Sequence, residues 1–271
     1  MPALTAPDGT QLTYDAYEAA APRSAVLVLH GWSDHASRWR ETGERLRAAG
    51  HSAYLLDLRG HGRSGGRPGH LSRFSQLLGD LQAFRRVVRI RTERPQQLLG
   101  LSFGALVVLR YLETQPSDPI TGAVIVAPFL GLGFRPPAWK LIAARMLADL
   151  WPTLPIPARI DPDTLSRDPT VNQAYAEDPA VHGIMTPGAW REIQWAQRAV
   201  AADSARIESP LLFLLGGEDR IVDGQLARAF ADSLKTSVRI RSYPEMYHEV
   251  LHDPQRDQAF GDVVAFLQAP L

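Results

Sequence analysis

Residues Gln97–Val108 read QLLGLSFGALVV, a short apolar run that ends in Gly-x-Ser-x-Gly and leads into a second apolar run of helical length. This pattern predicts a strand that turns sharply into a helix, with Ser102 at the apex of the turn. A side chain at Gly100 or Gly104 would collide with neighbouring backbone, because so tight a turn brings strand and helix together. We therefore expect Ser102 in a strained conformation, with the amide of Phe103 facing any oxyanion formed on a carbon that Ser102 attacks.

A second Gly-x-Ser-x-Gly lies at 62–66, where the surroundings predict a different structure. The residues after Ser64 read GGRPG, and this stretch of glycines with a proline cannot begin a helix. Ser102, in contrast, has an apolar run before it and a helical run after it. We therefore predict that Ser102 is a nucleophile and that Ser64 is a loop serine.

The composition of the chain is that of a globular protein with a substantial core. Hydrophobic residues make up 45% and charged residues 21% of the 271 residues, which suits one large α/β domain, with or without an insertion. Acidic and basic residues balance at 29 each without a basic stripe, so we expect no nucleic-acid partner. The absence of cysteine excludes disulfides, thiolate catalysis and cysteine-based metal centres.

The first residues and the hydropathy of the chain predict no targeting segment. The first nine residues, MPALTAPDG, have neither a basic start nor an apolar core, so no secretory signal is predicted. No run of about 20 apolar residues occurs, so no membrane-spanning helix is predicted. We therefore expect a cytoplasmic protein.

Strand-like and helix-like segments alternate along most of the chain. Asp8-Gly9 predicts a hairpin turn between two antiparallel edge strands within residues 3–18. The alternation that follows predicts an α/β fold with a mostly parallel, doubly wound sheet. Further strands are predicted at 25–29, 53–56, 97–101, 122–127, 211–215 and 238–243. Helices are predicted at about 37–49, from Ser72 as the cap to about Val88, after Ser102, at 224–234 and at 255–268.

The alternation breaks between residues 130 and 205, where no strand is predicted and prolines and aromatic residues are frequent. We predict an α/β core of residues 1–129 and 206–271, with 130–205 as a helical cap insertion over the carboxyl ends of the strands. Its apolar side chains are too many to bury within so small a segment, so some are expected to line a cleft above Ser102. They are Phe129, Leu130, Leu132, Phe134, Trp139, Ile142, Met146, Leu150, Trp151, Ile184, Trp190 and Trp195.

A nucleophilic serine needs a base, and the base needs an orienting acid. Asp219 follows the predicted strand at 211–215, and His248 follows the strand at 238–243. Catalytic triads on α/β sheets of this kind follow the chain order Ser, Asp, His, with each residue placed after a strand. We therefore predict Ser102, Asp219 and His248 as the catalytic residues.

Neighbouring residues could take two of these roles. Glu218 or Asp223 could serve as the acid, and His252 as the base. Asp219 is favoured because the glycines at 216–217 suit a tight exit from the strand. His248 is favoured because His252 lies further from the strand end.

The motifs together resemble those of a known family. The matching residues are His30-Gly31 after the first buried strand, Asp57–Ser64, the Ser102 turn, Gly216–Val222 and His248-Glu249. The chain is similar to the α/β-hydrolases of the monoglyceride lipase and lysophospholipase group, which is also classed with the serine aminopeptidases. The stretch 175–181, YAEDPAV, is similar as well.

The resemblance carries expectations for the mechanism. It implies an α/β-hydrolase fold, no cofactor and no metal, and hydrolysis through an acyl-enzyme. His248 would take the proton of Ser102, and Asp219 would hold the ring in the right tautomer. The backbone amides of Trp32 and Phe103 would form the oxyanion hole.

Candidate substrate contacts are predicted from two positions at which the chain differs from animal monoglyceride lipases and from the tryptophans of the insertion. Leu101 stands where animal monoglyceride lipases have a histidine, and Asp34 where they have a glutamate, near the family's glycerol site. Leu101 cannot hydrogen-bond a headgroup, whereas Asp34 and His35 either contact a polar headgroup or are solvated loop residues. The remaining candidates are Trp139, Trp151, Trp190 and Trp195. Four further polar residues, His30, Arg59, His61 and Arg63, are expected to brace loops.

The favoured function is a serine esterase acting on single-chain acyl esters of the monoacylglycerol or lysophospholipid type, with transient membrane contact through the cap. A second candidate is a peptidase of the proline iminopeptidase type, whose free-amine site would need an acidic pair from Asp161, Asp163, Glu177 and Asp178. A carbon–carbon bond hydrolase and a low-turnover binding protein are also compatible with the sequence. The sequence assigns no oligomeric state.

Overall fold

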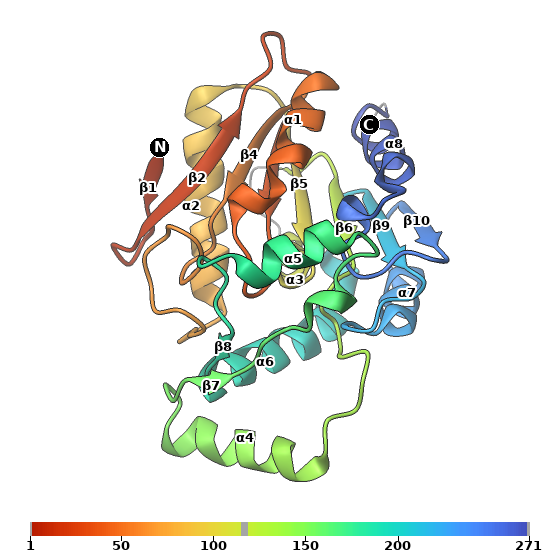
Figure 1. The fold of residues 1–271 in the computed structure, drawn as a ribbon. Coiled ribbons are helices and arrows are strands. Elements are labelled where there is room, and N and C mark those ends of the chain that lie inside the picture. The colour runs from red at the N-terminus through yellow and green to blue at the C-terminus, as the bar shows by residue number, and fades with distance from the viewer. Residues whose placement is uncertain (1, 115–118, 270–271) are drawn as a thin grey trace.

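A single eight-stranded sheet forms the centre of the computed structural model, which describes residues 2–114 and 119–269 (Figure 1). The strand order is β1-β2-β4-β3-β5-β6-β9-β10. The pairs β1–β2 and β2–β4 are antiparallel, and every other neighbouring pair is parallel. These strands are β1 (Ala3–Thr5), β2 (Gln11–Tyr17), β3 (Ala25–Leu29), β4 (Ser52–Leu56), β5 (Gln96–Leu101), β6 (Ala123–Val126), β9 (Leu211–Gly216) and β10 (Val238–Tyr243). The predicted α/β-hydrolase fold with a mostly parallel sheet is confirmed.

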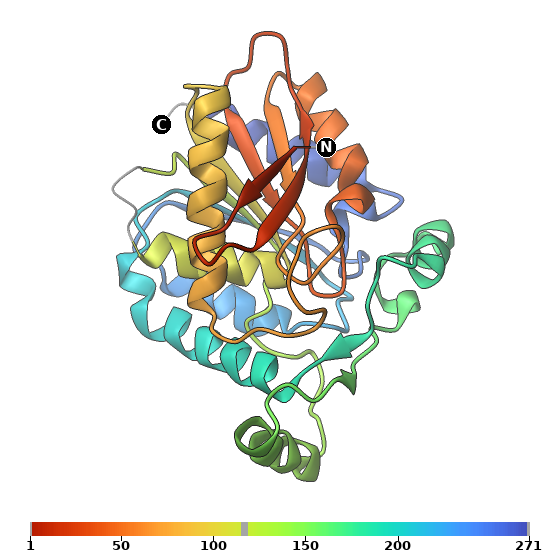
Figure 2. The same cartoon turned by 90° about the vertical axis from the view of Figure 1, so that its left-hand side faces the viewer.

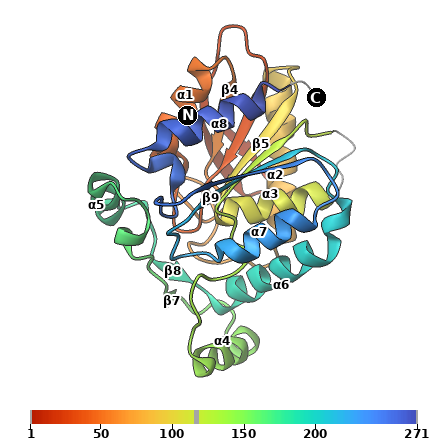
Figure 3. The same cartoon turned by 90° about the vertical axis from the view of Figure 1, so that its right-hand side faces the viewer.

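Helices cover both faces of this sheet, which explains the continuous apolar runs of its central strands. Every residue of β3, β4, β5, β6 and β9 is buried. Helix α2 (Ser75–Arg91) stands before the sheet in Figure 2, where it packs with α3 (Phe103–Glu113). Helices α1 (Arg40–Ala48) and α8 (Arg256–Leu267) lie on the other face, seen in Figure 3. Helix α7 (Gly224–Ser233) packs on β9 and β10.

The start of α2 differs from the prediction. The helix begins at Ser75, its N-cap residue is Phe74, and no side chain caps it. Glu192 of the 130–205 segment accepts the hydrogen bond of the Phe74 amide at 2.8 Å, while the Ser72 hydroxyl lies 3.2 Å from His70 Nε2. The predicted Ser72 cap is therefore wrong, because a residue distant in sequence takes the free amide.

The segment 130–205, called the insertion below, runs between β6 and β9. It contains α4 (Ala138–Leu150), α5 (Pro169–Glu177) and α6 (Pro187–Asp203). Helix α6 packs on α3, and α4 packs on α6 at the greatest distance from the sheet (Figure 1). Two short strands, β7 (Ile156–Pro157) and β8 (Ile184–Met185), pair antiparallel, so the expectation that the insertion holds no strand is wrong.

The helices of residues 2–114 and 119–269 do not meet the requirements of a bilayer span. The two longest in the described ranges, α2 and α6, have 17 residues each. None of the helices within these ranges has both the length and the apolar character that crossing a bilayer requires.

Candidate active site

Ser102 lies in a strained turn between β5 and α3. Its φ is +53°, in the left-handed region that residues with a side chain rarely adopt. A Cβ added at Gly100 would lie 2.6 Å from the Cα of Ala105, and one added at Gly104 would collide with the carbonyl of Leu29. The two glycines therefore permit the close approach of helix and strands that lifts Ser102 to the edge of the sheet.

The loop after β3 passes directly beside this serine. A Cβ added at Gly31 would come within 3.5 Å of the Ser102 Cβ. The neighbouring Trp32 packs its ring edge-on against the ring of Phe103, with centroids 5.0 Å apart. The two residues predicted to supply oxyanion-hole amides therefore lie side by side next to Ser102.

His248 and Asp219 meet at the carboxyl ends of β10 and β9. His248 Nδ1 lies 2.8 Å from Asp219 Oδ2, and both side chains are buried. The other carboxylate oxygen, Oδ1, accepts hydrogen bonds from the amides of Ile221 and Val222 at 2.8 and 3.0 Å. Three donors thus fix the Asp219 carboxylate and, through it, the orientation of the imidazole.

This geometry shifts the pKa values of both groups. Burial disfavours the charged ring of His248, but the adjacent Asp219 carboxylate outweighs burial and raises the pKa of His248 above its usual value. Burial likewise disfavours the charged carboxylate of Asp219, yet His248 and the two backbone amides lower its pKa. The pair therefore favours an ionised acid beside a histidine that readily takes up a proton.

The rival acid and base residues are engaged elsewhere. Glu218 is exposed, and Asp223 caps α7 by accepting a hydrogen bond from the amide of Leu226 at 2.9 Å. His252 Nδ1 lies 2.7 Å from Glu249 Oε2. The described structure brings neither rival acid to His248.

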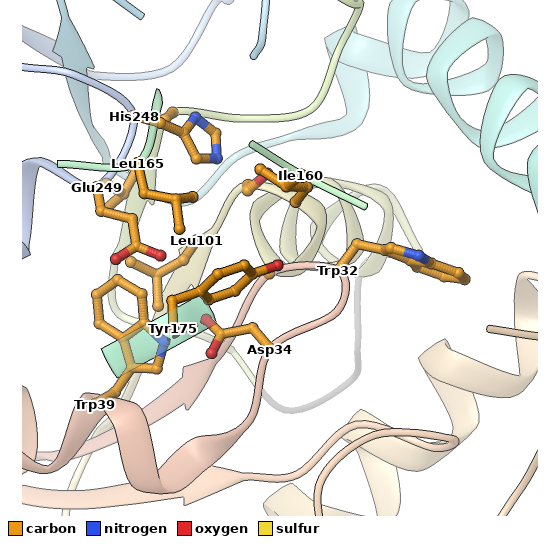
Figure 4. Close-up of a pocket in the computed structure, with 13 residues that line it drawn as sticks. Trp32, Asp34, Trp39, Leu101, Ile160, Leu165, Tyr175, His248 and Glu249 are labelled. Atoms are coloured by element: carbon orange, nitrogen blue, oxygen red, sulfur yellow. Dashed lines mark hydrogen bonds between the residues drawn. The ribbon is translucent and has the colours of Figure 1, made fainter. Parts of the chain in front are cut away.

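Ser102 and His248 line one small cavity (Figure 4). Its volume of about 20 Å³ is room for a single water molecule. Leu101, one of the candidate substrate contacts, contributes to the wall. The other lining residues are Gly31, Trp32, Asp34, Trp39, Val126, Ala127, Ile160, Leu165, Tyr175 and Glu249.

A buried charge network forms the polar side of the cavity. Asp34 Oδ1 accepts from Arg38 Nη1 at 2.9 Å, and its Oδ2 accepts from the Trp39 indole at 2.6 Å. Arg38 also binds both oxygens of Glu249, each at 3.0 Å. Burial disfavours both charges of this last pair, but pairing lowers the pKa of Glu249 and raises that of Arg38. Both groups therefore remain ionised.

The placement of Asp34 and His35 decides between their two predicted roles. Both residues are buried, so the prediction that they are solvated loop residues is wrong. His35 Nε2 lies 2.9 Å from Asp178 Oδ2 in the insertion, which leaves it no part in the cavity wall. Asp34 faces the cavity with both oxygens already bonded to protein donors.

The four tryptophans of the insertion lie away from this cavity. Trp139, Trp151 and Trp195 are 67%, 57% and 46% exposed. Trp190 is partly buried against the ring of Phe129, with centroids 6.4 Å apart. None of the four is among the described residues that line the cavity. Helix α6, which carries Trp190 and Trp195, packs on α3, and α4 packs on α6.

The insertion contributes other residues to the cavity, and sequence reasoning missed them. Ile160 and Leu165 come from loops before α5, and no sequence pattern singled them out. Tyr175 belongs to the YAEDPAV stretch that resembles the family, which was a usable signal.

The polar residues expected to brace loops do so, and that prediction is confirmed. His30, His61 and Arg63 each make a hydrogen bond between loops or within one, and Arg59 ties its loop to helix α2. The bonds join His30 to the amide of Leu58, His61 to the carbonyl of Arg59, Arg59 to Asp80, and Arg63 to Asp57.

Residues 20–255 match the serine aminopeptidase family S33. The chain belongs to this family. This S33 hydrolase is 32% identical over 270 residues to the monoacylglycerol lipase of Mycolicibacterium smegmatis, covering 97% of its own length and 95% of that protein. It is 25% identical to the phospholipase YtpA of Bacillus subtilis, covering 92% and 97% of the two chains.

A solved structure is similar as well. The crystal structure of a monoacylglycerol lipase from Paleococcus ferrophilus superposes with a TM-score of 0.84 at 28% identity, covering 94% of this S33 hydrolase and 98% of that chain. The predicted membership of the monoglyceride lipase and S33 group is therefore confirmed. The chain is a serine ester hydrolase of the esterase and lipase kind.

Proposed function

We propose that this S33 hydrolase cleaves single-chain acyl esters of the monoacylglycerol or lysophospholipid type, with Ser102, His248 and Asp219 as its catalytic triad. The observation that carries the proposal is the cavity shared by Ser102 and His248, with the His248 ring held by Asp219 at 2.8 Å. The names of the relatives, a monoacylglycerol lipase and a phospholipase, support this class of substrate.

The chemistry follows from the positions of these groups. His248 accepts the proton of Ser102 while the serine oxygen attacks the acyl carbon and forms a tetrahedral intermediate. The carbon–oxygen bond to the leaving alcohol then breaks, and His248 passes its proton to that alcohol. A water molecule, activated by the same histidine, attacks the acyl-enzyme and releases the fatty acid and the free serine.

The oxyanion of each intermediate would be stabilised by the amides of Trp32 and Phe103. Phe103 is the first residue of α3, whose N-terminus favours negative charge. Among the residues that the structure describes, no acceptor is bonded to either amide. Two amides without an acceptor beside the nucleophile would stabilise the negative charge that develops on the oxygen in the transition state.

The insertion would act as a cap over this site. Ile160, Leu165 and Tyr175 supply the part of the cavity wall that lies above the strand ends. An acyl chain needs far more space than one water molecule, so substrate entry would require these residues to move away from Ser102. The cap would then supply the apolar surface that receives the chain.

Helix α4 would bring the enzyme to the membrane surface, where such esters reside. Large apolar side chains are exposed on it, and the cations of Lys140 and Arg145 flank them. This combination is typical of helices that lie in the interface of a membrane. The exposed apolar residues in and beside α4 are Phe134, Trp139, Leu141, Ile142, Met146, Leu150 and Trp151.

The free-amine site of a peptidase finds less support. Within the described ranges, the carboxylates that line the cavity belong to Asp34 and Glu249, and Arg38 binds both. Of the acids predicted as candidates, Asp161 caps a short helix and Asp178 binds His35. A substrate amine would have to displace an internal ion pair.

A hydrolysis panel on one enzyme preparation tests the proposal. Monoacylglycerol, lysophosphatidylcholine, p-nitrophenyl esters and an aminoacyl-anilide are compared, with Ser102→Ala as the blank. We expect kcat/KM to increase with acyl length by up to about fourfold per methylene until the chain site is filled, because each buried methylene contributes about 0.8 kcal/mol. Preference for acetyl would contradict the lipid assignment, preference for the anilide would indicate a peptidase, and absent turnover would indicate a binding protein.

A further inference from the structure

The loop that carries the Trp32 amide is attached to the insertion at three points. The Trp32 indole Nε1 donates a hydrogen bond to the carbonyl of Ile184, the first residue of β8, at 3.1 Å. The ring of Trp32 packs edge-on against the ring of His182, with centroids 5.9 Å apart. The Ser33 hydroxyl lies 3.4 Å from His182 Nδ1.

The same loop is strained and cannot hold its conformation unaided. Ser33, directly after Trp32, has a φ of +58° and is completely buried. A residue with a side chain adopts this region only where its surroundings impose it, at a cost of about 1–3 kcal/mol. Two of the three attachments involve Trp32 itself. The insertion is therefore well placed to impose the strained conformation on this loop.

The carbonyl of Ile184, which accepts the indole hydrogen bond, is itself held in place. The amide of Thr186 donates to the carbonyl of Gly69 at 2.8 Å, and the amide of Ala158 donates to the carbonyl of Gly183 at 2.9 Å. A Cβ added at Gly69 would lie 2.5 Å from the carbonyl oxygen of Ile184, so the core loop at Gly69 approaches β8 closely. The Ile184 carbonyl therefore has a fixed position relative to the core.

The Trp32 indole does not reach the reacting atoms. Figure 4 shows its ring directed away from the centre of the cavity, and its edge meets Phe103, His182 and the insertion. An effect of the indole on turnover would therefore pass through the oxyanion-hole amides, that of Trp32 itself and, through the ring contact, that of Phe103. A displacement of about 1 Å in such a group can cost a hundredfold in rate.

We propose that β8 is part of the oxyanion hole, because the hydrogen bond from the Trp32 indole to Ile184 holds the Trp32 amide in its donating position. Trp32 is thus a positioning residue through its side chain and an oxyanion donor through its backbone. The insertion then does more than cover the substrate, since its position sets the geometry of the donor. This inference rests on the proposed function, in which the Trp32 amide binds the oxyanion.

Trp32→Phe tests the inference, because it removes the indole donor and keeps an aromatic ring against Phe103. We expect kcat for a p-nitrophenyl ester to fall about ten- to a hundredfold with KM changed less than about twofold. Affinity for a trifluoromethyl ketone, which forms a tetrahedral oxyanion on Ser102, should fall by the same factor as kcat/KM. Trp195→Phe is the matched control, because that ring is half-exposed and makes no indole hydrogen bond among the described residues.

His182→Ala is a second variant in case Trp32→Phe fails to fold. It removes the Ser33 contact and the ring contacts with Trp32 and His61, while the substituted residue itself belongs to the insertion. The same loss in kcat and in ketone affinity is expected. An unchanged kcat in the folded variants, or a raised KM at constant kcat, would overturn the inference. Failure of the wild type to hydrolyse any ester would instead overturn the proposed function, which separates the two results.

Discussion

His248 Nδ1 lies 2.8 Å from the Asp219 carboxylate, which is bonded on its other oxygen to two backbone amides. A carboxylate only accepts hydrogen bonds, so Nδ1 carries the proton and Nε2 keeps its lone pair. Figure 4 shows the ring directed into the cavity that Ser102 lines. In the proposed triad the base would therefore be oriented before any substrate arrives.

A fluorophosphonate should label Ser102 and spare Ser64. The Ser64 hydroxyl donates to the Asp57 carbonyl at 2.6 Å and accepts from the Thr13 amide at 2.9 Å, so it has no base to activate it. Peptide mapping by mass spectrometry locates the label. Ser102→Ala should abolish labelling while Ser64→Ala leaves it intact, and label on Ser64 would exclude Ser102 as the nucleophile.

Asp219→Asn and His248→Ala should each lower kcat by several orders of magnitude without unfolding the protein. Members of a triad act as a unit, so the double variant should be little worse than either single one. Steady-state kinetics on a p-nitrophenyl ester provides the measurement. Glu218→Gln and Asp223→Asn serve as controls that should keep a normal kcat. A large loss of kcat in either variant would assign the role of the acid to that residue instead of Asp219.

The pH profile of kcat/KM should report the raised pKa of His248. The ring must be neutral to accept the serine proton, so activity falls as pH falls through this pKa. Asp219→Asn removes the charge that raises it, and the acidic limb of the residual activity should therefore shift to lower pH. An acidic limb that stays in place would show that another group controls it.

The exposed face of α4 should bind anionic phospholipid vesicles. Replacing Ile142 and Met146 by serine removes apolar contacts that contribute roughly 1.5–3 kcal/mol each when fully buried, so at least tenfold weaker co-sedimentation is expected. Ile90→Ser on α2 is the control, because Ile90 is 87% exposed and lies outside the insertion. Equal vesicle binding by all variants would show that α4 does not contact the membrane.

Gly104→Ala should destabilise the fold and Gly261→Ala should stabilise it. The added Cβ at 104 would meet the carbonyls of Leu29 and His30, and such overpacking costs about 1–3 kcal/mol or more. The Cβ at 261 meets nothing within 4 Å in the interior of α8, where alanine is favoured over glycine by about 0.5–1 kcal/mol. Thermal unfolding distinguishes the two, and equal shifts would contradict the packing argument.

The central strands and the turn at Ser102 were predictable because their signals are local. Burial on both faces leaves a continuous apolar run, and the tight turn leaves glycines two residues before and after the serine. The contact between His248 and Asp219 was predictable for a related reason, since parallel strands end at one edge of the sheet.

The remaining features depend on contacts between distant residues. The Ser72 cap was wrong because Glu192 takes the amide at the start of α2. The tryptophans of the insertion were expected partly in the cleft, but apolar periodicity does not tell which way a helix faces. Trp139 faces outward on α4, while Ile160 and Tyr175, which no periodic pattern marks, reach the cavity.

The ion pair between Arg38 and Glu249 joins residues 211 positions apart. A chain still being synthesised has Arg38 early but lacks His248 and Glu249 until the last strand of the sheet, β10, has been made. Until then Asp34 is available to pair with the arginine, but the carboxylate that binds it through both oxygens is not. The polar side of the cavity beside Ser102 is therefore completed only late in synthesis, and a chain truncated after β10 would lack this ion pair together with the base of the proposed triad.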